Sequence, residues 1–532
     1  MGKKIPMWQC TVTILFTIIT LLYCLGILGM VFGDTFRCDY GEVHIALIVS
    51  CIFASLVAVA NGYKWSFLEA GILTSINRSM QAMLILLTVG CLIGSWIAAG
   101  VVPAMIYYGL MVLKPSVFLM ASCILCGIIS LATGSSWTTA GTIGIALIGV
   151  GMGLGINSAM TAGAIVSGAY FGDKMSPLSD TTNLAPAMAG ATLFDHIDHM
   201  IWTVTPSLVI ALVIYTILGL KVSGNTDISV VADMQQALRV NFVISPAMLI
   251  PPVVVILIVA LKLPALPGLM GGIILGCLIG SIFQGIPLAD WPYLLHYGYD
   301  VENFSSAFQS AADALQMNPV DILGMENGDF ASTAAGEGFS NAVIGEYNID
   351  ALIDHRGGMS SMLWTINLII CAMCYGGVMD ASGMLGTLAG ALLKLAKNTG
   401  MLVTVTVFSC IFMNIIAGDQ YLSLVLPGRM FKEAFEDRKL APKNLSRCLE
   451  DSGTITSNLV PWNTCGATMS TFLGVGQWGA GGYAPFAVLC WINPLVSIFY
   501  GFTGITMTEM SDDEYQKILE RRKKDEKEAL NA

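Results

Sequence analysis

The chain has 532 residues, of which 55% are hydrophobic and only 11% are charged, and its mean hydropathy is +0.73. Soluble domains carry about 25% charged residues, so this composition excludes a soluble protein. Several tracts reach the roughly 20 apolar residues that a membrane-spanning helix needs, and the alternation over about ten residues that marks outer-membrane barrels is absent. We therefore expect an all-α polytopic membrane protein.

The net charge of −11 is concentrated in one segment. Between Gly285 and Gly358 the sequence holds eleven acidic residues against Arg356 alone, which gives that segment a net charge of −10. The acidic balance therefore describes a loop, and it indicates neither a nucleic-acid partner nor a substrate preference.

The chain begins with two apolar tracts of spanning length. Thr11–Phe32 is too long for the core of a signal peptide and is expected to be a retained span, and Val43–Ala60 is expected to return across the membrane. The segment Asn61–Ser79 carries Lys64 and Arg78 against one acid, so the positive-inside tendency predicts a cytoplasmic loop.

Matching residues recur at separations of 283 to 285 positions, which indicates an internal repeat. The loop before the first unit is basic and the loop before the second is acidic, so the two units are predicted to have inverted topology. The matched positions are Gly94 and Gly377, Gly100 and Gly383, Gly134 and Gly418, Asp180-Thr181 and Asn463-Thr464, and Tyr215 and Tyr500.

The predicted topology has about ten spans plus two re-entrant hairpins, with both termini in the cytoplasm. Met80–Leu113 is expected to cross as one span, and the hairpin tips are placed near Gly134–Thr139 and Gly418–Ser423. Broken helices are expected at Phe171–Pro186 and Asp451–Gly466, where polar residues and prolines interrupt apolar sequence. The predicted segments are an N-terminal two-span segment (1–79), a first repeat (80–220), connecting spans (221–284), an acidic extracytoplasmic loop (285–358), a second repeat (359–504) and a charged cytoplasmic tail (505–532).

Inverted repeats with interrupted helices at matching positions indicate a transporter site near the middle of the membrane. An unwound segment frees backbone carbonyls, and side-chain oxygens beside it suit a hard cation such as Na⁺. The candidate ion- or substrate-binding residues are Asp173, Ser176, Ser179, Asp180, Thr181, Thr182 and Asn183 from the first unit, Ser457, Asn458, Asn463 and Thr464 from the second, and Ser136, Thr138 and Asp419 at the hairpin tips.

The two units differ in charge at their matched positions. Asp180 of the first unit corresponds to neutral Asn463 of the second, and one anionic ligand suits a single monovalent cation. Asp180, Thr181, Asn463 and Thr464 are therefore the predicted Na⁺ ligands, and a proton can compete with Na⁺ for the Asp180 carboxylate. Asp173 is the second candidate for this exchanging carboxylate.

Several polar residues have a plainer structural alternative. Asp173 and Lys174 could form an ion pair with each other, and Asp180 and Asp419 could cap helices. The pair His196 and His199 could sense cytoplasmic pH or lie on a solvated amphipathic connector.

Three further acidic residues have more than one possible role. Glu450-Asp451 could begin the second broken helix as a cap or take part in transport, and Asp380 could face the cavity. The pairs Cys123/Cys126 and Cys371/Cys374 lie in apolar helical runs without a nearby histidine, so we interpret them as packing residues.

Three stretches resemble the NhaC family of Na⁺/H⁺ antiporters: Gly134–Gly144, Gly168–Pro186 and Leu459–Gly466. The segments Gly418–Ser423 and Trp491–Pro494 are also similar to that family. The resemblance covers nearly the whole chain. It implies the fold of the ion transporter superfamily and a gradient-driven carrier in the cytoplasmic membrane of a prokaryote. The family also includes members similar to a malate–proton/sodium–lactate antiporter.

The sequence contains no P-loop, no histidine-rich metal motif and no nucleophile elbow, so we expect neither an enzyme nor a resident cofactor. The leading hypothesis is an antiporter that exchanges Na⁺ for H⁺. The alternative is a Na⁺- and H⁺-coupled exchanger of organic acids such as malate or lactate, although the polar stretches offer no arginine to clamp a carboxylate. The sequence leaves open whether the chain works in the bilayer as a monomer or as a homodimer.

Overall fold

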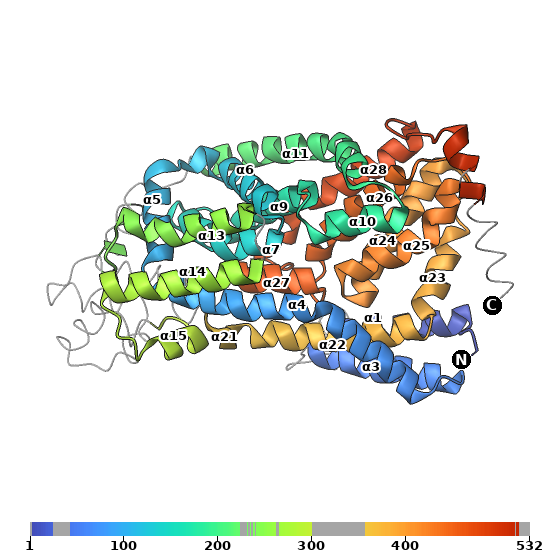
Figure 1. The fold of residues 1–532 in the computed structure, drawn as a ribbon, viewed down its shortest axis with the longest axis horizontal. Coiled ribbons are helices and arrows are strands. Elements are labelled where there is room, and N and C mark those ends of the chain that lie inside the picture. The colour runs from blue at the N-terminus through green and yellow to red at the C-terminus, as the bar shows by residue number, and fades with distance from the viewer. Residues whose placement is uncertain are drawn as a thin grey trace.

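The computed structural model describes residues 3–24, 43–223, 231, 235, 238–239, 241–261, 265–300, 357–516 and 518–520. Within these residues the chain is helical and contains no β-strand; Leu440 and Glu509 form an isolated antiparallel bridge. The helices form an elongated bundle (Figure 1). Most of the predicted acidic loop lies outside the described residues.

Eight helices in the described part are long and apolar enough to cross a membrane. The prediction of an all-α polytopic membrane protein is therefore confirmed. These spans are α1 (Met7–Cys24), α3 (Val43–Ala60), α4 (Trp65–Ala98), α6 (Pro115–Thr133), α11 (Leu193–Ser223), α14 (Ala265–Ile279) with the π-turn η4 (Gly280–Gln284), α21 (Gly358–Ser361) with α22 (Leu363–Ala381), and α24 (Thr399–Ala417).

Shorter elements connect these spans and build the polar interior. They are α5 (Val101–Val112), α7 (Ser136–Thr139), η2 (Ala140–Gly144), α8 (Ile145–Gly153), α9 (Ser158–Met175), α10 (Asp180–Ala189), η3 (Pro246–Leu249), α13 (Ile250–Ala260), α15 (Trp291–Tyr297), α23 (Met384–Leu393), α25 (Gln420–Glu436), α26 (Pro442–Leu449), η5 (Glu450–Thr454), η6 (Ser457–Leu459), α27 (Thr464–Leu473), η7 (Ala484–Phe486) and α28 (Val488–Thr503).

The same order of helices and breaks occurs twice along the chain. In each half a helix ends at a glycine with a left-handed backbone, the next helix follows, and a later helix is broken by a short unwound stretch. Gly134 ends α6 with φ of 67° and Gly418 ends α24 with φ of 65°, a conformation that glycine adopts without steric cost. These two turns lie where the hairpin tips were predicted.

The expected cytoplasmic loop at residues 61–79 is wrong, because α4 begins at Trp65 and continues for 34 residues. At 1.5 Å per residue such a helix is about 50 Å long, whereas the hydrocarbon core is about 30 Å thick. The charged residues therefore lie on a helical extension. The single crossing expected for Met80–Leu113 is also interrupted, since Gly100 with φ of 76° separates α4 from α5.

Small residues bring the principal helix pairs into close contact. On α9, a Cβ atom at Gly172 would collide with the Gly127 carbonyl of α6, and one at Gly168 would collide with the Cys123 carbonyl. Membrane helices associate through such small-residue contacts because lipid provides no hydrophobic driving force. The Cys123 thiol is buried and forms no disulfide, in agreement with the packing role predicted for it.

The segment after α28 folds back on the start of α26, and we call residues 505–510 the C-terminal strap. Ala441 N–H donates to the Thr508 carbonyl at 2.9 Å, and Met510 N–H donates to the Lys439 carbonyl at 2.8 Å. The Arg447 guanidinium donates to the Thr506 hydroxyl at 2.7 Å. The strap thus holds α26, at the end of the molecule where the N-terminal residues also lie (Figure 1).

Candidate functional site

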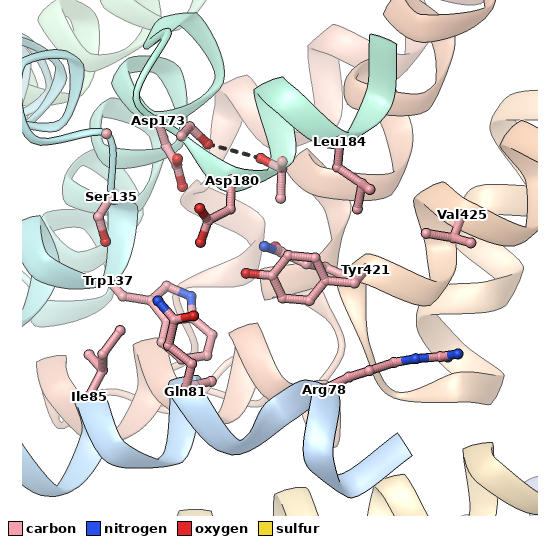
Figure 2. Close-up of a pocket in the computed structure, with 15 residues that line it drawn as sticks. Arg78, Gln81, Ile85, Ser135, Trp137, Asp173, Asp180, Leu184, Tyr421 and Val425 are labelled. Atoms are coloured by element: carbon pink, nitrogen blue, oxygen red, sulfur yellow. Dashed lines mark hydrogen bonds between the residues drawn. The ribbon is translucent and has the colours of Figure 1, made fainter. Parts of the chain in front are cut away.

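A cavity of about 440 Å³ lies where both predicted hairpin tips meet the first broken helix and α4. Figure 2 shows side chains from these elements converging on it. The lining residues are Arg78, Gln81, Ala82, Ile85, Gly134, Ser135, Trp137, Asp173, Ser179, Asp180, Thr181, Leu184, Gln420, Tyr421 and Val425. Four of the fourteen predicted site residues line it: Asp173, Ser179, Asp180 and Thr181.

Asp180 is the first residue of α10, and it is exposed within this otherwise buried region. Its carboxylate points into the space between Asp173, Trp137 and Tyr421 (Figure 2). The N-cap position of α10 belongs to Ser179, whose side chain makes no capping hydrogen bond, so Asp180 does not act as the cap that the sequence had left open. The first turn of a helix is a favourable place for a carboxylate because of the helix dipole.

Asp173 lies behind Asp180 and is held by the first hairpin tip. Its Oδ2 accepts hydrogen bonds from the Ser136 backbone N–H at 3.1 Å and from the Ser136 hydroxyl at 2.7 Å. Ser135 shapes this tip by accepting a hydrogen bond from the Thr138 backbone N–H at 3.1 Å. The predicted residues Ser136 and Thr138 therefore organise the tip, and Ser136 does so through direct contact with a carboxylate of the cavity.

The break between α9 and α10 is stabilised by side chains from the predicted set. The Thr182 hydroxyl donates to the Lys174 carbonyl at 2.9 Å, and the Asn183 amide donates to the Pro177 carbonyl at 2.9 Å. The Leu178 N–H donates to the hydroxyl of Ser176 at 3.3 Å. Ser176, Thr182 and Asn183 thus form hydrogen bonds with backbone groups that the interruption of the helix leaves unpaired. They stabilise the shape of the site, but they do not line the cavity.

Ser179 and Thr181 face the cavity and are joined to each other. Their hydroxyl oxygens lie 3.1 Å apart, the contact drawn as a dashed line in Figure 2. Together with the carboxylates of Asp173 and Asp180, they form a cluster of oxygen atoms on one wall. Oxygen donors of this kind are the ligands that hard cations prefer.

The second broken helix reaches the cavity indirectly, through Gln420. The Gln420 side-chain carbonyl accepts hydrogen bonds from the Ser457 hydroxyl at 3.2 Å and from the Cys465 thiol at 2.8 Å. Gln420 itself lines the cavity, whereas Ser457, Asn458, Asn463 and Thr464 do not. The residues Asn458, Asn463 and Thr464 are buried within the second broken helix.

Asn463 has partners that explain its position. Its side-chain oxygen accepts from the Cys465 N–H at 3.0 Å and its amide donates to the Asn414 carbonyl at 3.1 Å. Asp419 is likewise structural, because its carboxylate caps α25 by accepting from the Leu422 N–H at 2.9 Å. Of the two possibilities left open for Asp419, the structure supports the helix cap.

The interpretation of Asp173 and Lys174 as an ion pair with each other is wrong. Lys174 is fully buried and forms its ion pair with Asp451 of the second broken helix. The Asp451 carboxylate also accepts hydrogen bonds from Thr203 at 3.0 Å and from Asn493 at 2.7 Å. Adjacent residues on a helix point in different directions, so Asp173 faces the cavity while Lys174 faces the neighbouring unit.

An arginine at the cavity wall was missed from the sequence. Arg78 of α4 lines the cavity, and its guanidinium lies 3.4 Å from the Asp380 carboxylate, with side-chain exposures of 48% and 31%. In Figure 2 the Arg78 side chain extends away from Asp180. The sequence feature that could have pointed to Arg78 is the charged stretch Lys64–Arg78. Its charges led to the prediction of a loop there.

The two histidines are buried, so the solvated connector considered for them is wrong. His196 Nδ1 lies 2.8 Å from the Ser446 hydroxyl, and within the described part of the chain the Nε2 atoms of His196 and His199 have no hydrogen-bond partner. Both lie in the first turns of α11, which begins at Leu193. They therefore belong to the buried polar interior beside Asp451 and Arg447.

Comparison with known proteins gives a consistent match. The model of the Na⁺/H⁺ antiporter family matches residues 168–317 and 325–505. The chain is 35% identical to the Na⁺/H⁺ antiporter NhaC of Alkalihalophilus pseudofirmus, over 87% of this chain and 91% of that protein. It is also 35% identical to the malate-2H⁺/Na⁺-lactate antiporter of Bacillus subtilis, over 92% and 95%. The arginine/ornithine antiporter ArcD of Halobacterium salinarum is 33% identical, over 88% of each chain.

Proposed function

The chain belongs to the NhaC family of Na⁺/H⁺ antiporters, and from this premise we propose that it exchanges Na⁺ for H⁺ across the cytoplasmic membrane. It is a multi-pass membrane transporter and not an enzyme. The observation that carries the proposal is the Asp180 carboxylate, which faces the cavity and has no ion-pair partner among the residues that the structure describes.

In the proposed mechanism Asp180 holds either Na⁺ or H⁺. Na⁺ binds to the Asp180 carboxylate together with the oxygens of Ser179, Thr181 and Asp173, and protonation of Asp180 releases the ion. Ser136 keeps the Asp173 carboxylate oriented by two hydrogen bonds and so positions the second acidic oxygen donor. Energy comes from the ion gradients, which supply about 2.3 kcal/mol per charge per 100 mV.

Alternating access is proposed to use two inverted repeats, residues 80–220 and 359–504. The recurring order of helices and the paired left-handed glycines support this division, as does the asymmetry between Asp180 and Asn463. With both hairpins re-entrant, the two chain ends lie on the cytoplasmic side. The two broken helices would then expose one shared cavity alternately to either face.

Exchange of an organic solute is the second candidate, and the size of the cavity favours it. Na⁺ alone needs far less than about 440 Å³, a volume in the range of small-molecule sites. Arg78, Gln81 and Gln420 add donors to the wall that could contact a carboxylate or an amino acid. Relatives whose names specify malate, lactate, arginine or ornithine belong to the same group.

The test uses purified protein in liposomes and follows radioactive Na⁺ uptake driven by an imposed pH gradient. The wild type should accumulate Na⁺, and Asp180→Asn should lose at least ~100-fold of this activity because an amide cannot exchange a proton. Asp198→Asn, an equivalent change at an exposed position on α11, is the matched control and should behave like the wild type. Wild-type exchange by folded Asp180→Asn would refute the role of Asp180.

The same vesicles distinguish the two candidate functions. Labelled malate, lactate, arginine and ornithine are offered under the same gradients, with and without Na⁺. Uptake of one of these solutes that depends on Na⁺ or on the pH gradient would favour the second candidate. Na⁺ uptake that proceeds without any of them supports simple cation exchange.

A further inference from the structure

A second cavity, of about 880 Å³, lies between α1, α23 and α24 and shares no lining residue with the cavity at Asp180. Its walls come from Met7–Leu15, Leu388–Leu395 and Met401–Ile415, and we call it the α24 groove. Leu15 and Phe408 of these walls are 52% and 56% exposed. Because α1 and α24 are spanning helices, the groove opens on the surface that faces lipid.

The described residues that line the α24 groove are all apolar except Thr11 and Thr404. The Thr11 hydroxyl donates to the Met7 carbonyl at 3.0 Å, and the Thr404 hydroxyl donates to the Gly400 carbonyl at 2.8 Å. Both hydroxyl donors are therefore used within their own helices. A sugar, an amino acid or a carboxylate would lose its hydrogen bonds to water here without replacement, which is costly. The walls therefore suit a hydrocarbon chain.

The length of the α24 groove fits one leaflet of a bilayer. Its wall on α24 runs from Met401 to Ile415, about 21 Å at 1.5 Å per residue. Its wall on α1 runs from Met7 to Leu15, about 12 Å by the same measure. The hydrocarbon core of a bilayer is about 30 Å thick, so one leaflet contributes roughly 15 Å. The two walls bracket that depth, and one acyl chain can lie along them.

One end of the α24 groove is flanked by positive charge alone. The segments that build the groove, residues 3–24 and 384–417, contain four lysines and no acidic residue. Two lysines precede α1 and two follow α23, beside the lining residue Leu395, and all four are exposed: Lys3, Lys4, Lys394 and Lys397. Among the described residues none of these lysines forms an ion pair. This end therefore attracts an anion from outside the chain.

The lysine end of the groove lies at the level of the bilayer surface. Trp8, next to the lining residue Met7, is 65% exposed, and tryptophan is enriched at membrane–water interfaces. The segment before α1 is held in place, because the Lys3 N–H donates to the Asn61 carbonyl at 2.9 Å. The Asn61 amide in turn donates to the Gln9 side-chain carbonyl at 2.6 Å. Helix α23 and the N-terminal residues lie at the same end of the molecule (Figure 1).

We propose that the α24 groove binds one anionic phospholipid, with an acyl chain along α24 and the phosphate at the four lysines. Lysines near the bilayer surface attract anionic headgroups, and basic sites between membrane helices bind acidic lipids. Helix α24 ends at Gly418, two residues before Gln420 in the wall of the transport cavity. The lipid thus packs against the helix that carries this hairpin tip. The site does not depend on which cargo the transporter exchanges.

The experiment measures lipid retention by native mass spectrometry. Delipidated protein is offered equal amounts of phosphatidylglycerol and phosphatidylcholine with the same acyl chains, and the wild type should retain one phosphatidylglycerol with at least ~10-fold preference. Each lysine near an anionic headgroup contributes about fivefold in affinity, so Lys394→Gln/Lys397→Gln should bind it at least ~10-fold more weakly. Lys114→Gln/Lys221→Gln, which removes two exposed lysines elsewhere, is the matched control and should behave like the wild type. Equal retention of both lipids by the wild type would indicate unspecific surrounding lipid and would overturn the inference.

A second measurement locates the acyl chain in the wild-type protein. Phosphatidylglycerol with a photoreactive group at the end of one chain is cross-linked by illumination, and the labelled peptides are identified by mass spectrometry. Labelling should concentrate on Met401–Ile415, and Ala391→Trp, which fills the groove, should reduce it at least ~5-fold. Val213→Trp, at a position of α11 that is 53% exposed, is the matched control and should leave it unchanged.

Labelling spread equally over α11 and α24 would overturn the inference. The same holds if a second copy of the chain occupies the groove. In that case native mass spectrometry would show dimers that Ala391→Trp dissociates, with no bound phosphatidylglycerol.

Discussion

Lys174 points away from its neighbour Asp173 and forms a buried ion pair with Asp451, 277 positions later in the chain. The pair joins the end of α9 to the π-turn η5, and so joins the two broken helices to each other. Ion pairs of this kind contribute little net stability, but removing one partner leaves a buried charge without compensation.

We therefore predict that Lys174→Met destabilises the protein severely. The free energy of unfolding should fall by about 3–5 kcal/mol, because among the described residues Asp451 would keep only the Arg447 guanidinium, 3.9 Å away, as a charged partner. Adding Asp451→Leu to Lys174→Met should recover much of this loss, since no unpaired anion then remains. Thermal unfolding of the purified variants would show this, and a double variant no more stable than Lys174→Met would contradict it.

Ser136→Ala tests the link between the first hairpin tip and Asp173. The substitution removes the 2.7 Å hydroxyl hydrogen bond and keeps the backbone N–H bond. Hydrogen bonds to charged groups contribute about 1.5–3 kcal/mol, which corresponds to roughly 10- to 150-fold in affinity. We expect the KM for Na⁺ to rise within that range with little change in Tm. Ser136→Thr, which keeps a hydroxyl, should recover most of the affinity, and an unaltered KM in Ser136→Ala would exclude the positioning role.

Arg78→Gln separates the two candidate functions. Arg78 is about half-exposed, and exposed ion pairs such as the one with Asp380 contribute about 0–1 kcal/mol. If the cargo is Na⁺ alone, Na⁺ uptake should therefore change less than ~5-fold and the Tm should hardly move. If an organic anion is carried, its apparent affinity should fall by 10-fold or more while Na⁺ binding persists. The measurement is a titration of Tm with malate and lactate for both proteins.

Gly172→Ala should prevent tight packing of α9 against α6. The new Cβ atom would collide with the Gly127 carbonyl, and overpacking of this kind costs about 1–3 kcal/mol or more. Gly386→Ala is the control, because nothing lies within 4 Å of that position in α23. The control should be neutral or more stable by about 0.4–1 kcal/mol, through the lower entropy of the unfolded chain. Equal Tm values for the two variants would contradict the close contact.

Local sequence features predicted the turns and breaks of the site. Gly134 and Gly418 end helices at the predicted tips, and the α9 helix ends and resumes within the predicted stretch Phe171–Pro186. These features depend on residues close together in sequence, where glycine, proline and polar side chains have strong backbone preferences.

Partners that lie far apart in sequence could not be predicted in the same way. Lys174 pairs with Asp451 and not with Asp173 because of the way α9 is oriented against the second unit. Residues adjacent in sequence do not determine that orientation. Arg78 was missed because a charged stretch is compatible with both a loop and the projecting end of a long helix. Asn463 and Thr464 were predicted as ligands from the repeat alone, but the hydrogen bonds of the second broken helix leave Gln420 at the wall instead.

The C-terminal strap is linked to the buried charges through a side-chain hydrogen bond. Thr506 is hydrogen-bonded to Arg447, which lies one helical turn from Asp451, and Glu450 lies next to Asp451. A tag, a protease cut or a bound protein that pulls on residues 505–510 would therefore act on the buried charges that join the two broken helices. Transport rates measured with C-terminal fusions would report on the fusion as well as on the transporter.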